Sequence, residues 1–309
     1  MQSNYVGRFA PSPSGPLHFG SLICALASYL HAKQHQGKWL VRIEDIDTPR
    51  IDTKYSQMIL DSLRAHGMQW DDEVLYQSQR HAIYEDVLAD LHYKKQLYAC
   101  ECSRRQIRER TPPAAQYYDQ HCREKGLGFE NKAIRWKNNA HRQMFDDLHY
   151  GRVTVEDKFA FEDPVLKRAD GIYAYHLAVI ADDIAQGVNF IVRGSDLLDL
   201  SPLHLSLFEA FRYPVPQFFH IPVAASEAGQ KLSKQHHAPA IKNELALSNL
   251  KSALHFLACE HRDIDQIDDA ETLLSWAISH FSFDNISAKR EILVSRINDV
   301  YCLSRENKK

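Results

Sequence analysis

The segment that most constrains the fold of this chain is residues 7–21, which runs from an apolar stretch into a loop rich in proline and glycine. Residues 5–9 carry aromatic and β-branched side chains typical of a strand, and the prolines and glycine of 11–16 exclude both a helix and further strand pairing. Apolar residues then recur at helical spacing over 22–30, and residues 39–43 have the composition of a strand again. The sequence therefore predicts a strand, a crossover helix and a second strand.

In a unit of this kind, ligands bind beyond the carboxyl ends of the strands, and the free N–H groups at the start of the helix attract anions. His18 and Gly20 stand at that predicted helix start. An imidazole can donate to phosphate oxygens, and a glycine lets a ligand approach the backbone. The segment has neither the Gly-Lys-Ser/Thr of a Walker loop nor the dinucleotide fingerprint. Taken alone, the loop fits a phosphate site and a plain proline-rich connector with a surface histidine equally well.

A second cluster of residues favours the phosphate site. Residues 230–235 read Gln-Lys-Leu-Ser-Lys-Gln, after Gly229 and before two histidines. A Lys-x-Ser-Lys loop supplies two ammonium groups and a hydroxyl, which can stabilise a leaving pyrophosphate as negative charge develops on it. The two segments together indicate a site for the phosphates of ATP.

These two segments resemble the paired signature motifs of class I aminoacyl-tRNA synthetases. The motifs stand here as His18-Phe19-Gly20-Ser21 and Lys231-Leu232-Ser233-Lys234-Gln235. Ser21 and Leu232 are the forms that look like the glutamyl branch of that class, whereas Gln235 departs from the closing serine of the family motif.

The resemblance implies an α/β fold: a Rossmann-type parallel sheet with an inserted zinc-containing connective segment and a helical C-terminal region. It also implies that magnesium binds together with ATP. It assigns roles to the motif residues, of which the catalytic ones are His18, Ser21, Lys231 and Lys234, and the ATP-binding ones are His18, Gly20 and Lys234.

A pocket for a free acidic amino acid needs a cation for each carboxylate and an anion for the ammonium group. Arg8, Glu44 and Arg193 stand at predicted strand ends, where α/β enzymes place their sites. The fork of an arginine binds a carboxylate through two parallel hydrogen bonds. Resemblance to glutamyl-tRNA synthetases implies a glutamate pocket in which Glu44 takes the α-ammonium group and Arg193 a carboxylate, formed by Arg8, Ala10, Ser12, Glu44, Tyr175 and Arg193. Taken one at a time, these residues fit ordinary surface charges or a core tyrosine as well.

Three of the six cysteines lie close together in the sequence, at Cys100, Cys102 and Cys122. They are one ligand short of a closed tetrahedral zinc site. Coordination chemistry nominates His121 as the fourth ligand, whereas resemblance to short glutamyl-synthetase-like proteins that modify tRNA implies Tyr118, which we take as the prediction. The alternative is three reduced thiols without a metal. The remaining cysteines, Cys24, Cys259 and Cys302, are expected on helices as buried apolar residues.

Composition agrees with a soluble enzyme. The chain has 309 residues, 44% of them hydrophobic, and a formal net charge of −3, which does not favour tight binding of nucleic acid without regard to sequence. No stretch reaches membrane-spanning length, and the first residues lack the basic and apolar blocks of a signal peptide. We expect a cytoplasmic protein that does not bind membranes, and a monomer.

The chain divides into four predicted parts. Residues 1–98 form the first half of the Rossmann catalytic domain, and 99–185 an inserted connective, acceptor-type subdomain with the zinc site. Residues 186–240 form the second half of the catalytic domain with the lysine loop, and 241–309 a helical stem-contact-like region. Because so little sequence follows the lysine loop, we expect no anticodon-binding domain.

This organisation looks closest to short paralogues of glutamyl-tRNA synthetase that attach glutamate to the queuosine base of tRNA(Asp). The resemblance implies ATP-dependent formation of glutamyl-adenylate and transfer of glutamate to that base, with ATP, L-glutamate and queuosine-containing tRNA(Asp) as partners. Three alternatives remain: a truncated discriminating glutamyl-tRNA synthetase, a tRNA-independent adenylate-forming enzyme, and a non-catalytic binding paralogue. Composition and spacing alone indicate only a phosphate site, a charged pocket and a zinc knuckle.

Overall fold

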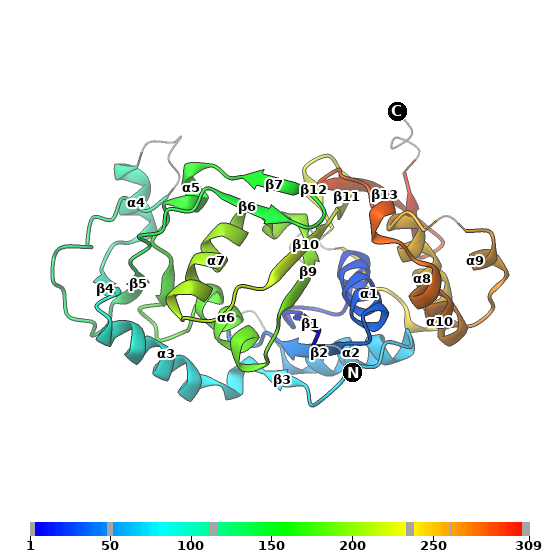
Figure 1. Ribbon diagram of the computed structural model, residues 1–309, viewed down its shortest axis with the longest axis horizontal. Coiled ribbons are helices and arrows are strands. Elements are labelled where there is room, and N and C mark those ends of the chain that lie inside the picture. Colours follow the sequence, from blue (N-terminus) through cyan, green and yellow to red (C-terminus); the bar gives the residue numbers. More distant parts are fainter. Residues whose placement is uncertain (1–3, 48–51, 112–116, 233–237, 260, 305–309) are drawn as a thin grey trace.

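The computed structural model describes residues 4–47, 52–111, 117–232, 238–259 and 261–304. The molecule is elongated, with parallel strands in its middle and the cysteine-containing part at one end. At the other end lie helices α8 (Ala246–Phe256), α9 (Asp263–Gln266) and α10 (Ala270–His280) (Figure 1). Among the described residues, no helix combines the length and the apolar character needed to cross a membrane.

The centre of the fold is built from parallel strands, as the first motif predicted. β2 pairs with β1 on one side and with β3 on the other, and β9 pairs with β10, all in parallel. The two groups meet where the backbone N–H of Asn189 donates to the carbonyl oxygen of Val6 (3.1 Å). The carboxyl ends of these strands therefore lie on one side of the molecule. The bounds are β1 (Val6–Phe9), β2 (Lys38–Ile43), β3 (Leu75–Tyr76), β9 (Phe190–Gly194) and β10 (Gln217–Ile221).

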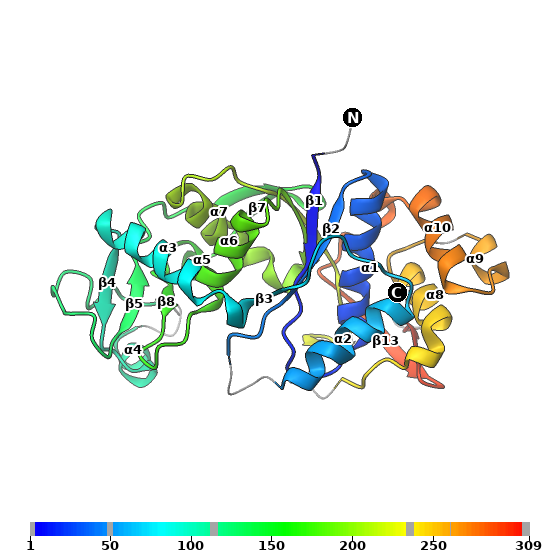
Figure 2. The ribbon, with the colours of Figure 1, turned by 90° about the horizontal axis from the view of Figure 1, so that it is seen from below.

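Helix α1 (Phe19–Gln34) connects β1 to β2 and is buried along most of its length. It packs on the side of β1 and β2 that faces α8 and α10, whereas α3 and α6 lie on the opposite side (Figure 2). The chain leaves the helix at Gly37, where a Cβ atom would lie 2.6 Å from the carbonyl oxygen of Tyr5. Only glycine permits so close an approach of the returning chain to β1. The helix that follows β2 is α2 (Thr53–Ala65).

A second hydrophobic core joins α3, α6 and α7 to the antiparallel strands β4, β5 and β8. The predicted domain boundary at residue 98 does not coincide with a break in packing, because Tyr84 and Leu88 of α3 belong to this core. The last helix before this boundary ends at Tyr93, and Leu97 starts a strand. The bounds are α3 (His81–Tyr93), β4 (Leu97–Cys100), α4 (Arg104–Arg110), β5 (Ala133–Trp136), α5 (Asp157–Ala160), β8 (Val165–Lys167), α6 (Tyr175–Ala185) and α7 (Ser201–Ala210).

The hairpin of β6 (Met144–Asp147) and β7 (Gly151–Thr154) comes from the predicted insertion but packs against β10. The backbone N–H of Leu148 donates to the carbonyl oxygen of Phe218 (2.9 Å), and the ring of Phe145 packs against the ring of Phe218. The hairpin thereby places Asp147 beside the second half of the central sheet.

The expectation that residues 241–309 are helical is wrong for residues 291–303. Strand β13 pairs in parallel with β11, and β14 pairs antiparallel with β13. Cys302 therefore lies exposed on a strand, and buried Cys259 follows a helix. The expectation that both lie on helices is wrong. The bounds are β11 (Val223–Glu227), β12 (Gln230–Lys231), α8 (Ala246–Phe256), α9 (Asp263–Gln266), α10 (Ala270–His280), β13 (Glu291–Ile297) and β14 (Val300–Leu303).

The last strands also support the start of α1. The buried ring of Tyr301 in β14 stacks on Phe19, with ring centroids 4.8 Å apart. We predict that Tyr301→Ala lowers the free energy of unfolding by about 3–5 kcal/mol, because it leaves a cavity beside the helix start. Urea unfolding measures this loss. Cys302→Ser, on the exposed neighbour, serves as the control, and a loss below about 1 kcal/mol in Tyr301→Ala would show that these strands are peripheral.

Candidate active site

All ten described residues predicted for the amino-acid and ATP sites line one cavity of about 580 Å³. It lies at the carboxyl ends of the parallel strands. Its lining comes from the end of β1 and the loop after it, from the start of α1, from the residue after β2, from α6 and β9, and from the hairpin that leads to the lysine loop. The eleventh predicted residue, Lys234, lies outside the described residues. The residues brought together are Arg8, Ala10, Ser12, His18, Gly20, Ser21, Glu44, Tyr175, Arg193 and Lys231.

His18 is the N-cap of α1. Its Nδ1 accepts the backbone N–H of Ser21 (3.3 Å), and its Nε2 lies 3.0 Å from the Ser21 hydroxyl. The cap therefore fixes the imidazole at the end of the helix where anions are attracted. This geometry agrees with the predicted phosphate site.

The two motif segments meet although more than two hundred residues separate them. Ala240 forms a β-bridge with His18, and a Cβ atom on Gly20 would lie 3.5 Å from the carbonyl oxygen of Leu232. The chain on both sides of residues 233–237 thus contacts the first loop. Lys231 lines the same cavity and forms an ion pair with Asp196 (2.6 Å).

A group of buried charges includes two residues that line this cavity, Arg8 and Glu44. Asp183 binds Arg8 (3.0 Å) and Arg42 (2.8 Å), and Arg42 lies 3.8 Å from Glu44. Burial raises the pKa of Glu44 to about 7, although Arg42 and Arg8 act in the opposite direction. Burial would also raise the pKa of Asp183, but Arg42 and Arg8 hold it below its ordinary value. Glu44 is therefore the carboxylate of this group that is poised to gain or lose a proton near neutral pH.

Arg193 is a buried cation. No carboxylate oxygen of the described residues lies within 4.0 Å of its guanidinium, and burial lowers its pKa. Its N–H groups donate to the side chains of His204, His220 and Ser201 and to the carbonyl oxygen of Leu197. A buried cation without a counter-ion that lines a cavity can bind a carboxylate of a ligand.

The histidines around Arg193 were not predicted from the sequence. His204 lies on α7 and His220 on β10, while His176 lies on α6 next to the predicted pocket residue Tyr175. Asp147 of the β6–β7 hairpin binds His220 (2.6 Å). Only the position of His176 next to Tyr175 could have pointed to one of them, because the others stand alone in the sequence.

The three predicted cysteine ligands come together at the other end of the molecule. Their Sγ atoms lie within 4.8 Å of one another, and those of Cys102 and Cys122 are 3.5 Å apart. The hydroxyl of Tyr118 lies 3.3 Å from the Cys100 sulfur and 3.7 Å from that of Cys102. The rival ligand His121 is exposed and contacts Lys125 (2.8 Å) instead.

Comparison with known proteins places these features in a family. Residues 5–254 match the family described as tRNA synthetases class I (E and Q), catalytic domain. The chain belongs to this family. The family predicted from the two motifs is thereby confirmed.

Among curated proteins, the Glutamyl-Q tRNA(Asp) synthetase of Shewanella amazonensis is 46% identical to this synthetase over 292 residues, which cover 94% of this chain and 98% of that protein. The protein of the same name from Escherichia coli O6:H1 is 44% identical over 280 residues, covering 91% and 90% of the two chains.

Solved structures agree with this family. The glutamate-tRNA synthetase of Elizabethkingia anophelis superposes with a TM-score of 0.76 at 25% identity, covering 92% of this chain and 67% of that one. The methionyl-tRNA synthetase of Mycobacterium tuberculosis in complex with methionyl-adenylate has a TM-score of 0.56 at 11% identity and shows the shared fold alone.

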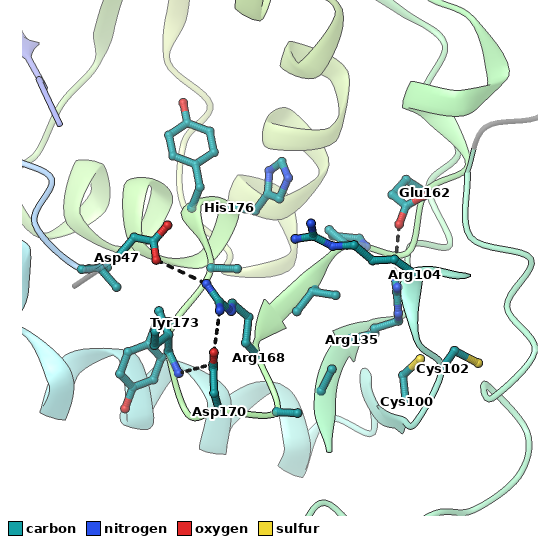
Figure 3. Close-up of a pocket in the computed structure, with 18 of the residues that line it drawn as sticks. Asp47, Cys100, Cys102, Arg104, Arg135, Glu162, Arg168, Asp170, Tyr173 and His176 are labelled. Carbon is teal, nitrogen blue, oxygen red and sulfur yellow. Dashed lines mark hydrogen bonds and ion pairs between the residues drawn. The ribbon is translucent and has the colours of Figure 1, made fainter. Parts of the chain in front are cut away.

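A larger groove of about 1260 Å³ leads from the cavity of about 580 Å³ to the cysteine group. Ser12, Glu44, Tyr175 and His176 line both spaces. Basic and acidic side chains lie next to one another along the groove (Figure 3). Arg168 binds Asp47 (3.3 Å) and Asp170 (2.5 Å), and Arg135 binds Glu162 (3.0 Å). Arg104 also lines the groove and has no acidic partner among the described residues.

Because Glu44 is half protonated near pH 7, an ammonium ligand must displace that proton at lower pH. We predict that the KM for glutamate in pyrophosphate exchange rises about tenfold from about pH 8 to about pH 6, since the pKa of free Glu44 lies between these values. In Glu44→Gln the KM should be raised and nearly independent of pH. A wild-type KM that stays constant over this range would remove Glu44 from ammonium binding.

Proposed function

We propose that this synthetase activates glutamate with ATP and transfers it to the queuosine base of tRNA(Asp). The observation that carries the proposal is the cavity in which a helix N-terminus capped by His18, a lysine, an acidic group and a buried arginine meet, and this arginine has no acidic partner among the described residues. The names and the lengths of the relatives agree with this choice of substrate and acceptor.

In the first step, Arg193 holds the side-chain carboxylate of glutamate and Glu44 its α-ammonium group. The α-carboxylate attacks the α-phosphorus of ATP, and pyrophosphate leaves. His18 and the N-terminus of α1 hold the phosphates while Lys231 and Lys234 stabilise the charge on the leaving group. Magnesium, when bound, neutralises phosphate charge and is held largely by the phosphates themselves.

In the second step, a hydroxyl of the queuosine cyclopentenediol attacks the activated carbonyl and AMP leaves. No protein nucleophile is required, because the adenylate is already reactive. The groove that shares Ser12, Glu44, Tyr175 and His176 with the amino-acid cavity gives a nucleic acid access to that carbonyl. A monomer working in the cytoplasm, where ATP and tRNA occur, is part of the same proposal.

We infer that the cysteine group holds a structural zinc ion through Cys100, Cys102, Cys122 and Tyr118. In a tetrahedral site with Zn–S distances of about 2.3 Å, donor atoms lie about 3.8 Å apart. Three of the separations among the sulfurs and the Tyr118 hydroxyl are 3.3, 3.7 and 3.5 Å, and all three sulfurs lie within 4.8 Å of one another, which fits this arrangement. Arg110 donates to the Cys102 sulfur (3.2 Å) and Arg135 lies over the Tyr118 ring (3.8 Å), so cations are placed to stabilise thiolates.

Elemental analysis of the purified chain tests the zinc site. We predict about one zinc per chain, which is lost in Cys102→Ser and retained in the control Cys302→Ser. Tyr118→Phe should release zinc to a chelator more readily than His121→Ala. Equal zinc content in Cys102→Ser and the wild type would exclude the site, and release caused only by His121→Ala would replace Tyr118 with His121.

Transfer of radiolabelled glutamate to tRNA tests the function. We predict label on total tRNA whose 3′-terminal nucleotide has been removed, because the acceptor is an internal base, and no label on tRNA from cells unable to make queuosine. Periodate oxidation of the diol should also abolish transfer. Full labelling of queuosine-free tRNA would identify a discriminating glutamyl-tRNA synthetase, and exchange without any transfer would favour a tRNA-independent enzyme.

A further inference from the structure

The hydrogen bonds of Arg193 use four of the five N–H groups of its guanidinium. Nε donates to His220 Nε2 (2.9 Å), Nη1 to His204 Nδ1 (3.2 Å), and Nη2 to the Ser201 hydroxyl (2.9 Å) and the Leu197 carbonyl (3.2 Å). Every one of these acceptors is neutral. One Nη1 N–H has no partner among the described residues, and the side chain lines the amino-acid cavity.

These contacts fix the tautomers of the histidines. Because an arginine can only donate, His220 Nε2 and His204 Nδ1 must both carry lone pairs. The proton of His220 is therefore on Nδ1, where Asp147 accepts it (2.6 Å). The proton of His204 is on Nε2, where His176 Nδ1 accepts it (3.2 Å). Burial keeps both rings neutral, lowering the pKa of His220 to about 4 and that of His204 well below its ordinary value.

The acidic groups near Arg193 are bound elsewhere. Asp183 pairs with Arg8 and Arg42, and Asp196 pairs with Lys231. Asp147 is separated from Arg193 by the ring of His220. The direct contacts thus hold the guanidinium in place through neutral groups, and Asp183 and Asp196 act on its charge only from a distance.

We propose that Asp147, His220 and His204 are positioning residues that hold Arg193 through neutral acceptors, and that this frame makes the pocket select a side-chain carboxylate over an amide. The inference rests on the proposed function, in which Arg193 binds the side chain of glutamate. A carboxylate ligand compensates the buried charge, whereas the amide of glutamine leaves it uncompensated. An acidic residue in the frame would compensate Arg193 in advance and remove this preference.

The matched variants His204→Asn and His204→Asp test the frame. They differ only in charge, and the Oδ1 of either residue can take the place of the histidine Nδ1. We predict that His204→Asn keeps kcat/KM for glutamate within about threefold of the wild type, because a neutral acceptor remains. His204→Asp should lower it on the order of 10²-fold, with the KM for ATP unchanged and the preference for glutamate over glutamine largely lost.

Thermal unfolding separates this effect from damage to the fold. His204→Asp should be as stable as His204→Asn or more so, since it pairs with a buried cation. If His204→Asp does not fold, His220→Gln and His220→Glu provide the same comparison of a neutral with a charged acceptor, now at the Nε of Arg193. Wild-type activation of glutamate with equal glutamate kinetics in the two members of a pair would overturn the frame alone. A wild type that neither binds nor activates glutamate would overturn the proposed function and the inference together.

Discussion

The site depends on a buried positive charge that has no direct acidic partner among the residues that the structure describes. Arg193 lies near the end of a central strand, where one ring nitrogen of His204 and one of His220 accept its hydrogen bonds. The nearby carboxylates of Asp183 and Asp196 are paired with other cations. Such an arrangement costs folding free energy, which hydrogen bonds to neutral acceptors only partly offset. A ligand carboxylate recovers the remainder. The preference for an acidic amino acid is thus built into the protein before any substrate arrives.

Parallel topology brings the parts of this site together. Because β1, β2 and β9 run in the same direction, Arg8, Glu44 and Arg193 reach one cavity from distant parts of the sequence. The C-terminal strands also bring distant segments together. β13 pairs with β11 just before the lysine loop, and Tyr301 of β14 packs against the start of α1. The first motif loop and the strand before the lysine loop are therefore each supported by a C-terminal strand.

The first motif and its unit could be predicted from the sequence because proline, glycine and helical spacing act locally, and His18 caps α1 where the pattern placed it. The three cysteines were also close enough in sequence to suggest a cluster. Strands β13 and β14 were missed because their pairing partners are long-range, and the surrounding leucine-rich helices dominated the pattern. The frame of Arg193 was invisible for a similar reason: Asp147, His204 and His220 come from a hairpin, a helix and a strand, and only tertiary packing joins them.

A crystal structure with glutamate or a non-hydrolysable glutamyl-adenylate analogue tests the central claim most directly. The account predicts that an oxygen of the side-chain carboxylate lies within hydrogen-bonding distance of Arg193 Nη1 while His204 and His220 keep their contacts, with the α-ammonium group at Glu44. A side-chain carboxylate bound at another cation, with Arg193 left without a ligand, would contradict it.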